Sequence, residues 1–561
     1  MHKRTILVPI LALLALIGVG VAVDGDPAGI LSGNLQARSA TLAQFDGLAL
    51  TPAQQGAVQF AFGDFSALSS EALEVSASPW KLATALLALR YAGGHLDGVT
   101  PQAVTAMYQS YGFVTPTRIA NWPAGMPQPG LNGPLGQNIG FASRVLPPIG
   151  LTIGNIACAG CHASVVYGAD GRPDISTFWL GTPNGSINLQ RYVTELYAAL
   201  RDRPEDEEFI WAAVQKLYPE TDWREWLALK TVVLSRVKDL VAKQEATIGR
   251  LLPFEVSTSG ATNGLQALQA RFGIIPSDQI ADRNPTISVP ELGSRIWRSS
   301  LLAGGSYGVP GETPLRVMRA GDITDAHLRA LAGLTAFFTV PSMGTLPTTA
   351  ARHVDDAEHI MDWLRDYKPQ PFPGEIDKAS AERGSLVYAS ACASCHGSYS
   401  AGIDAPALVE FPNWQGDIGT DRTYLEEFDQ ASVDAVNGLG YDGLLQARLS
   451  PNYVAQPLTG LWSSAPYLHN GSVPTLWHLM HPAERPSQFD VGGHALDLAK
   501  VGIAGMDHDG MWITPPDYTP WAAPVRIDTA LPGLHAIGHE TPFDTMSEPD
   551  KAALLDYLKL L

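Results

Sequence analysis

Cysteine is scarce in this chain, which has four among 561 residues. Basic residues are also few, because 37 Lys and Arg stand against 56 Asp and Glu and give a formal net charge of −19. No basic stripe interrupts this acidic excess, and an acidic surface repels the phosphates of nucleic acids and of anionic lipids. The composition therefore argues against both as partners. With 45% hydrophobic and 17% charged residues, the chain has the makeup of a globular protein with ample core.

Long apolar runs are missing beyond the first 23 residues. That segment starts with Lys3 and Arg4, continues as an apolar run and stops before Asp24. The pattern predicts a secretory signal peptide over residues 1–22, and the run is also about long enough for an uncleaved membrane anchor. Either interpretation makes the remaining chain periplasmic or secreted. Contact with a membrane is expected only if the segment stays uncleaved.

All four cysteines belong to two copies of Cys-x-x-Cys-His, at Cys158, Cys161 and His162 and at Cys392, Cys395 and His396. In an exported protein two disulfides are the first alternative, but they leave the repeated histidine as a coincidence. A four-cysteine zinc ribbon places its pairs about 15–20 residues apart, far closer than these. No thioredoxin-like strand and helix pattern surrounds either motif, which argues against a redox dithiol.

The spacing instead predicts two covalently attached haem c groups. Two intervening residues allow one helical turn to present both sulfurs to the vinyl groups of a porphyrin, and the adjacent histidine then reaches the iron. A neutral imidazole suits iron in both oxidation states. His162 and His396 are therefore the predicted axial ligands of the first and the second haem, and every cysteine is used for attachment.

A helix is expected to lead into the second motif, and another to end the chain. Gly384 and Tyr388 on the former and Tyr557 on the latter predict a crossing at which glycine permits close approach. We expect a mainly α fold with extensive loops and two c-type cytochrome haem domains, the first enlarged by insertions. Residues 30–366 form the expected N-terminal haem domain, and residues 374–561 the C-terminal cytochrome c domain. Proline-rich residues 367–377 are the expected linker.

Three stretches carry a resemblance to a known family: "APYLHNGSVPTL" (465–476), "LMHPAERP" (479–486) and "GHE" (538–540). They resemble the bacterial dihaem cytochrome c peroxidases and methylamine-utilisation dihaem enzymes. The longer run is most similar to the rubber-oxygenase branch, exported dihaem cytochromes that cleave poly(cis-1,4-isoprene). The resemblance covers residues 376–561 and the first motif, with a looser match at residues 288–308. It implies a redox enzyme in which the second haem relays electrons, while the first binds O₂ or H₂O₂ opposite His162, the catalytic residue.

The resemblance also implies His539 as the distal ligand of the second haem. The family has Asn-Ser-Asn ahead of Gly-His, whereas this chain has "LHAIGH", which makes His535 a rival. A peroxidase-like methionine ligand is the other alternative, with candidates Met480, Met506, Met511 and Met546. A structural role beside aromatic residues is expected for His469, and packing or surface roles for His478 and His481. No distal ligand is evident for the first haem, since no His or Met lies close to Cys158 in the sequence.

Trp297 and Trp462 are candidates for an aromatic residue between the haems. The expected partners are an electron donor or acceptor protein, such as a small cytochrome or a cupredoxin, together with O₂ or H₂O₂. Calcium between the domains is left open as a further cofactor. Peroxidase, oxygenase and protein-modifying oxidase remain alternatives, because one scaffold supports several chemistries. The alternative from another class is a non-catalytic electron-transfer cytochrome with both haems six-coordinate.

Overall fold

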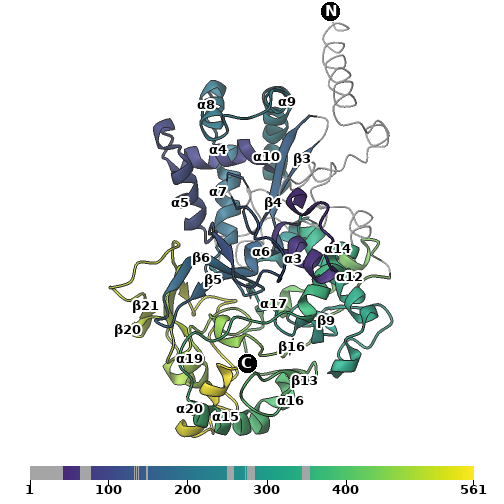
Figure 1. Ribbon diagram of the computed structural model, residues 1–561, viewed down its shortest axis with the longest axis vertical. Helices are drawn as coiled ribbons and strands as arrows, with labels where there is room; N and C mark the ends of the chain where they lie inside the picture. The colour runs from purple at the N-terminus through teal and green to yellow at the C-terminus, as the bar shows by residue number, and fades with distance from the viewer. Residues whose placement is uncertain are drawn as a thin grey trace, which may run out of the picture.

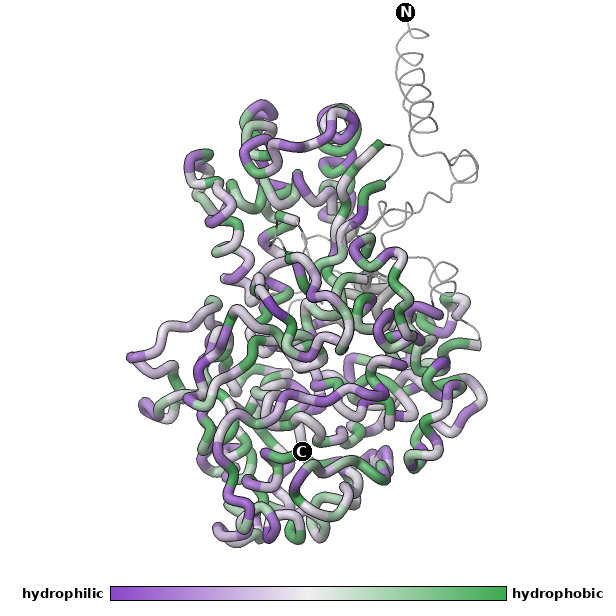
Figure 2. Tube along the Cα trace, viewed as in Figure 1, coloured by the Kyte–Doolittle hydropathy of each residue, from purple (hydrophilic) through white to green (hydrophobic). Residues whose placement is uncertain are grey.

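The computed structural model describes residues 42–63, 78–146 without 132, 134 and 137, 149–248, 258–271, 273–274, 285–343, 354–441 and 443–561. The predicted signal peptide or anchor, residues 1–22, lies outside this part of the chain. Among the described helices, none combines the length and the apolar character needed to cross a bilayer. Figure 2 shows polar and apolar residues interleaved along the whole described trace.

The fold is mixed rather than mainly α: it is 39% helical and 16% strand, with many small sheets. The prediction of a mainly α fold with two c-type cytochrome haem domains is therefore wrong. The Gly- and Pro-rich stretch before the first motif forms a hairpin of β3 (Phe141–Leu146) and β4 (Leu151–Ile156). After the motif, β5 (Ala163–Tyr167) pairs with β6 (Pro173–Leu180). Aromatic and branched residues between turn glycines favour such short strands.

Six helices gather at the top of the molecule in Figure 1 and surround a hydrophobic core of their own. Helical sequence patterns over residues 186–217 and 222–250 correspond to α7 (Leu189–Arg201) with α8 (Glu207–Leu217) and to α9 (Trp223–Ala228) with α10 (Leu234–Ile248). The first breaks between α7 and α8, where Asp206 Oδ1 accepts the backbone N–H of Glu208 at 3.0 Å and starts a new helix. The second contains a π-helical turn over Leu229–Val233. The six helices are α4 (Trp80–Tyr91), α5 (Pro101–Ser110), α7 (Leu189–Arg201), α8 (Glu207–Leu217), α9 (Trp223–Ala228) and α10 (Leu234–Ile248).

The other hydrophobic core draws residues from the whole length of the chain, from Phe45 to Leu561. Both Cys-x-x-Cys-His motifs lie beside this core, because Cys158 and Cys392 pack against it. Its helices are α3 (Pro52–Phe62), α6 (Cys158–Cys161), α11 (Gly264–Arg271), α12 (Asp325–Met343), α14 (Val354–Arg365), α15 (Lys378–Ala391), α16 (Ala393–His396), α17 (Thr423–Glu427), α18 (Gln430–Asn437), α19 (Leu476–Met480) and α20 (Glu548–Leu558).

The small sheets join segments that are distant in the sequence. Three-stranded sheets form in the orders β1-β4-β3, β2-β6-β5, β15-β10-β9 and β11-β13-β12, and one four-stranded sheet has the order β20-β21-β17-β22. Met318 pairs with Phe411, and Tyr307 pairs with Ala447, so strands from residues 300–319 are built into sheets of the C-terminal region. The remaining strand bounds are β1 (Ser78–Pro79), β2 (Arg118–Ile119), β7 (Ala261–Thr262), β8 (Ile287–Ser288), β9 (Ser300–Leu301), β10 (Tyr307–Gly308), β11 (Met318–Arg319), β12 (Ser398–Tyr399), β13 (Leu408–Phe411), β14 (Gln415–Gly416), β15 (Gln446–Ala447), β16 (Tyr453–Val454), β17 (Gln488–Val491), β18 (Leu496–Asp497), β19 (Gly502–Ile503), β20 (Met506–His508), β21 (Met511–Ile513) and β22 (Val525–Asp528).

The helix crossing predicted from Gly384 is confirmed between α15 and α20, at the bottom of Figure 1. A Cβ atom on Gly384 would overlap the carbonyl oxygen of Ala553 and would lie 2.9 Å from the Cβ of Tyr557. One turn further along, the rings of Tyr388 and Tyr557 pack with centroids 5.4 Å apart. Glycine therefore sets the distance between the two helices, and α15 then leads directly to α16 of the second motif.

The same crossing recurs between α3 and α14, beside the first motif. A Cβ atom on Gly56 would overlap the carbonyl oxygen of His359, and the rings of Phe60 and Trp363 lie 4.6 Å apart. In both crossings the aromatic side chain follows the contact residue by four positions. Helix α3 also contacts α6, which carries Cys158 and Cys161. The sequence did not reveal this second crossing, because long insertions separate α3, α6 and α14 along the chain.

Replacing Gly384 with Ala should lower the free energy of unfolding by about 2 kcal/mol, because a methyl group has no space between the crossed backbones. The measurement is denaturant unfolding followed by circular dichroism. Gly321→Ala is the matched control, since nothing lies within 4 Å of a Cβ atom at that position. Equal stability of the two variants would contradict the close approach of α15 and α20.

Candidate functional site

Each Cys-x-x-Cys-His motif occupies a single helical turn. Cys158 and Cys161 bound α6, and His162 follows immediately as its C-terminal cap before β5 begins. In the second motif, Cys392 caps both the end of α15 and the start of α16, which ends at His396. No disulfide links any of the four cysteines. Both pairs of thiols are thus presented from one turn, as attachment to a porphyrin requires.

The two motif histidines are held in the same way. His162 donates its Nδ1–H to the carbonyl oxygen of Pro290 at 3.0 Å, and His396 donates its Nδ1–H to the carbonyl oxygen of Gln456 at 2.7 Å. This bond fixes the tautomer in which Nε2 keeps its lone pair for a metal. Burial lowers the pKa of His162 to about 4 and also lowers the pKa of His396. Both imidazoles are neutral donors, and this donor set fits haem iron.

His539 faces His396. The centroids of the two imidazole rings lie 6.1 Å apart. Two imidazoles on opposite sides of one metal ion have ring centres roughly 6 Å apart when each metal–nitrogen bond is about 2 Å. The Nδ1 atom of His539 is buried and has no hydrogen-bond partner among the described residues. The ring stacks on Phe543 at 5.5 Å, and the backbone N–H, in a left-handed conformation, donates to Ile418 O at 2.7 Å. The pair fits a six-coordinate iron.

His535, the rival residue, is engaged elsewhere. It donates its Nδ1–H to Asp421 Oδ2 at 2.6 Å, and its side chain is 39% exposed. The pair lines an open surface pocket together with Asp417 and Arg422. No ring contact joins His535 to His396 among the described residues, whereas the ring of His539 faces that of His396.

The methionine candidates are scattered. Met480 is 1% exposed inside α19, and Met546 packs at the edge of the main core. Met506 and Met511 belong to the paired strands β20 and β21, where Met506 is 41% exposed. Among the described residues, none of these sulfur atoms forms a hydrogen bond with His162 or His396; Met511 Sδ accepts from Arg526 Nη1.

Three further histidines of the C-terminal region, His469, His478 and His481, pack against neighbouring side chains. His469 stacks on Tyr453 with ring centroids 4.0 Å apart, and its carbonyl oxygen accepts the N–H of Ser288. His478 is 3% exposed and shares a hydrogen bond of 2.8 Å between its Nδ1 and Thr475 Oγ1. His481 lies on the ring of Trp477 at 4.2 Å and reaches Glu548 through Nε2 at 2.9 Å.

The two candidate tryptophans occupy different settings. Trp462 is 2% exposed, packs edge-on against Phe372 and donates its indole N–H to the carbonyl oxygen of Gln370 at 2.9 Å, which is the environment of a core residue. Trp297 is partly exposed and lies in the short helix Arg295–Trp297. Its segment contacts His162 through Pro290 and reaches Gln456, which holds His396, through Arg295 and Arg298.

That segment, Pro290 to Arg298, together with Gln456 forms what we call the proximal bridge. Pro290 holds His162, and the carbonyl of the next residue, Glu291, accepts Arg295 Nε at 2.6 Å. Arg295 Nη1 donates in turn to Gln456 Oε1, and Gln456 O holds His396. A continuous series of hydrogen bonds and peptide units thus joins the two motif histidines. The sequence did not predict it, because the acceptors at both ends are backbone carbonyls.

Comparison with known proteins covers one part of this site. Residues 452–490, which include Gln456, match a family described as RoxA-like, cytochrome c-like. The chain thus contains a cytochrome c-like region related to that of the rubber oxygenase RoxA, which implies covalently bound haem c and a redox protein.

Two proteins of Sinorhizobium fredii are similar over longer stretches. Uncharacterized protein y4iM is 32% identical over 171 residues, 26% of this chain and 38% of that protein. Uncharacterized protein y4iJ is 28% identical over 347 residues, 49% of this chain and 55% of that protein. The chain spans less than two thirds of the length of either relative.

Asn413 anchors the proximal bridge, and Asn413→Ala should lower the free energy of unfolding by about 3 kcal/mol. Its side chain is 1% exposed, donates to the carbonyls of Trp297 and Arg316 at 3.2 and 2.8 Å, and accepts the N–H of Ser299 at 3.2 Å. Each buried group left unpaired costs roughly 1–3 kcal/mol.

The check on Asn413 is chemical denaturation, with Gln430→Ala as the control. Gln430 is exposed and bonds only Asp434, so this change should alter stability by less than about 0.5 kcal/mol. Equal effects of the two substitutions would show that Asn413 does not anchor the bridge.

Proposed function

We propose that the chain is an exported dihaem c-type cytochrome and a redox enzyme whose two haems have unequal roles. The observation that carries this proposal is the asymmetry of the two motifs. His396 faces a second imidazole, that of His539, with ring centroids 6.1 Å apart. Within the described part of the chain, no second imidazole ring contacts His162. The reaction is peroxidase-like or rubber-oxygenase-like, with O₂ or H₂O₂ as the oxidant.

In this proposal the histidines of the two motifs have different roles. His396 and His539 would hold the relay haem between their two imidazoles, and the hydrogen bond from His396 Nδ1–H to Gln456 O fixes the orientation of one of these rings. His162 binds on one face of the other site, and its hydrogen bond to Pro290 O raises its basicity as a ligand. The bound haems supply one-electron chemistry and the reduction of O₂ or H₂O₂. His162 is the catalytic residue of this proposal.

The charge of the chain suggests the kind of electron partner. A formal charge of −19 attracts a small cytochrome or cupredoxin that has a basic or neutral contact face. Nucleic acid is not a proposed partner, and a membrane is one only if residues 1–22 remain attached. Calcium stays a prediction: among the described residues, no three His, Cys, Asp or Glu side chains gather as a metal site.

Low-temperature EPR of the oxidised protein, matured in the periplasm of a host that attaches haem c, tests the proposal. One high-spin and one low-spin ferric signal are expected, and the reduced protein should bind carbon monoxide at one haem. Two low-spin signals without carbon monoxide binding after reduction would indicate a non-catalytic electron carrier instead.

His539→Ala should convert the low-spin signal to high spin, because it removes the imidazole opposite His396. His535→Gln is the matched control, since His535 is bound to Asp421, and it should leave the low-spin signal unchanged. EPR of both variants is the measurement. The reverse pattern would transfer the ligand assignment to His535.

A further inference from the structure

The proximal bridge contains two arginines without an anionic partner. Arg298 is 3% exposed, and its Nη1 donates to Gln456 Oε1 at 2.7 Å while its Nη2 donates to Leu302 O at 3.1 Å. Arg295 donates to Gln456 Oε1 and to the carbonyl of Glu291. All of these acceptors are uncharged. Neither guanidinium forms an ion pair with a carboxylate of the described residues, and Arg298 Nε is buried without a hydrogen-bond partner.

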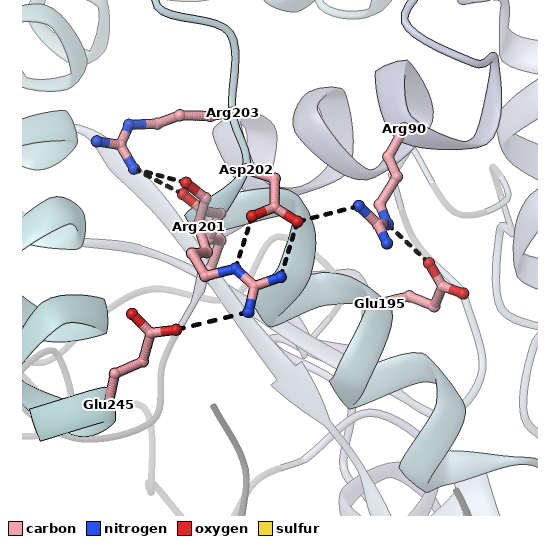
Figure 3. A network of polar contacts seen from close by, with 7 residues as sticks. Arg90, Glu195, Arg201, Asp202, Arg203 and Glu245 are labelled. Atoms are coloured by element: carbon pink, nitrogen blue, oxygen red, sulfur yellow. Dashed lines mark hydrogen bonds and ion pairs between the residues drawn. The ribbon is translucent and has the colours of Figure 1, made fainter. Parts of the chain in front are cut away.

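Exposed arginines elsewhere in the chain, such as Arg90 and Arg201, do form ion pairs with carboxylates. Figure 3 shows Arg201 bound to Asp202 and near Glu245, and Arg90 bound to Glu195 and Asp202. These surface pairs are hydrated and contribute little to stability. In the bridge, two like charges instead converge on one amide oxygen away from water. Burying unpaired charges costs several kcal/mol per ion, so the arrangement requires an anion.

Glu291 does not supply that anion. Its Oε1 accepts the hydroxyl of Tyr367 at 2.7 Å and the N–H of Gly293 at 3.2 Å, whereas its Oε2 is buried without a partner. Burial raises the pKa of Glu291 to about 8, so the carboxyl group is mostly uncharged at neutral pH. Glu291 therefore compensates only part of the charge of Arg295, and it forms no ion pair with Arg298 among the described residues.

The position of the arginines indicates the missing anion. They lie between Pro290, which holds His162, and Gln456, which holds His396, so they stand beside both haem sites. Each haem brings two propionate carboxylates, and guanidinium groups bind carboxylates strongly and with defined geometry. We propose that Arg295 and Arg298 bind haem propionates at the junction of the two sites and that their charge raises the reduction potentials of both irons. This inference rests on the proposed dihaem function.

The physical reason for the effect on potential is electrostatic. A buried cation disfavours the ferric state, which has one more positive charge than the ferrous state, and a medium of low dielectric transmits this interaction well. Loss of one guanidinium charge should therefore lower both midpoint potentials. A surface arginine is screened by water and salt and should have little effect.

The test uses the full-length holoprotein and spectroelectrochemical titration of both haems. Arg298→Gln should raise the ferric-to-ferrous ratio of both haems at least tenfold at a fixed potential, equivalent to a fall of about 59 mV for a one-electron couple. Arg298→Lys keeps the charge, so its ferric-to-ferrous ratios at the same potential should stay within about twofold of those of the unmutated protein. Arg201→Gln is the matched surface control, and it should also leave both ferric-to-ferrous ratios within about twofold.

Gln456→Glu gives a second variant that does not remove a guanidinium. It places a carboxylate between the two arginines, keeps the backbone carbonyl for His396, and should lower both potentials as Arg298→Gln does. It therefore keeps the test decisive if Arg298→Gln does not fold. Resonance Raman spectra should show shifted propionate bending bands in both variants.

The outcomes separate this inference from the proposed function. Fewer than two covalent haems in the unmutated protein, counted by the pyridine haemochrome assay, would overturn the proposed function itself. Two haems with unchanged potentials and propionate bands in Arg298→Gln and Gln456→Glu would overturn only the arginine site. Potentials that depend on chloride or phosphate concentration, with unchanged propionate bands, would assign the site to a free anion and also overturn it.

Discussion

The hydrogen bond from each motif histidine to a backbone carbonyl is the constraint on which the rest of the site depends. It fixes the tautomer and the ring orientation, so that Nε2 is the only nitrogen left for iron. The acceptors belong to Pro290 and Gln456, which are distant in sequence from the motifs they serve. Neither histidine is therefore oriented by its own helical turn alone. Each becomes a defined ligand only when remote segments have packed beside it.

Because the histidines depend on remote segments for their orientation, both motifs pack against the same hydrophobic core. Residues 300–319 contribute strands to sheets of the C-terminal region, and Asn413 ties the carbonyls of Trp297 and Arg316 together. A buried side chain that satisfies several backbone groups fixes a segment more tightly than apolar packing does. The proximal bridge is thus held from outside by the same elements that build the main core.

The sequence predicted the parts of the site that depend on local spacing. The two motifs and the Gly384 crossing follow from residues a few positions apart, and both have a side-chain signature. The mixed fold did not follow, because the sequence predicted a mainly α fold, whereas the Gly- and Pro-rich residues before the first motif form β3 and β4. Nor did the Gly56 crossing, whose partners are separated by long insertions. The choice between His539 and His535 depended on Asp421, which only the fold brings to His535. Backbone acceptors such as Pro290 O have no signature in a sequence.

The charges on the surface and the charges of Arg295 and Arg298 have different physical effects. The net charge of −19 lies mostly on hydrated side chains, where water and salt screen each interaction within about 10 Å. In the proposed dihaem arrangement, the guanidinium groups of Arg295 and Arg298 would lie at the junction of the two haem sites and would be less screened than charges on the surface. These two cations would then influence the irons more than the larger but diffuse surface charge. In the same proposal, the acidic exterior would attract the electron partner while the interior sets the potentials, so the two properties could vary independently.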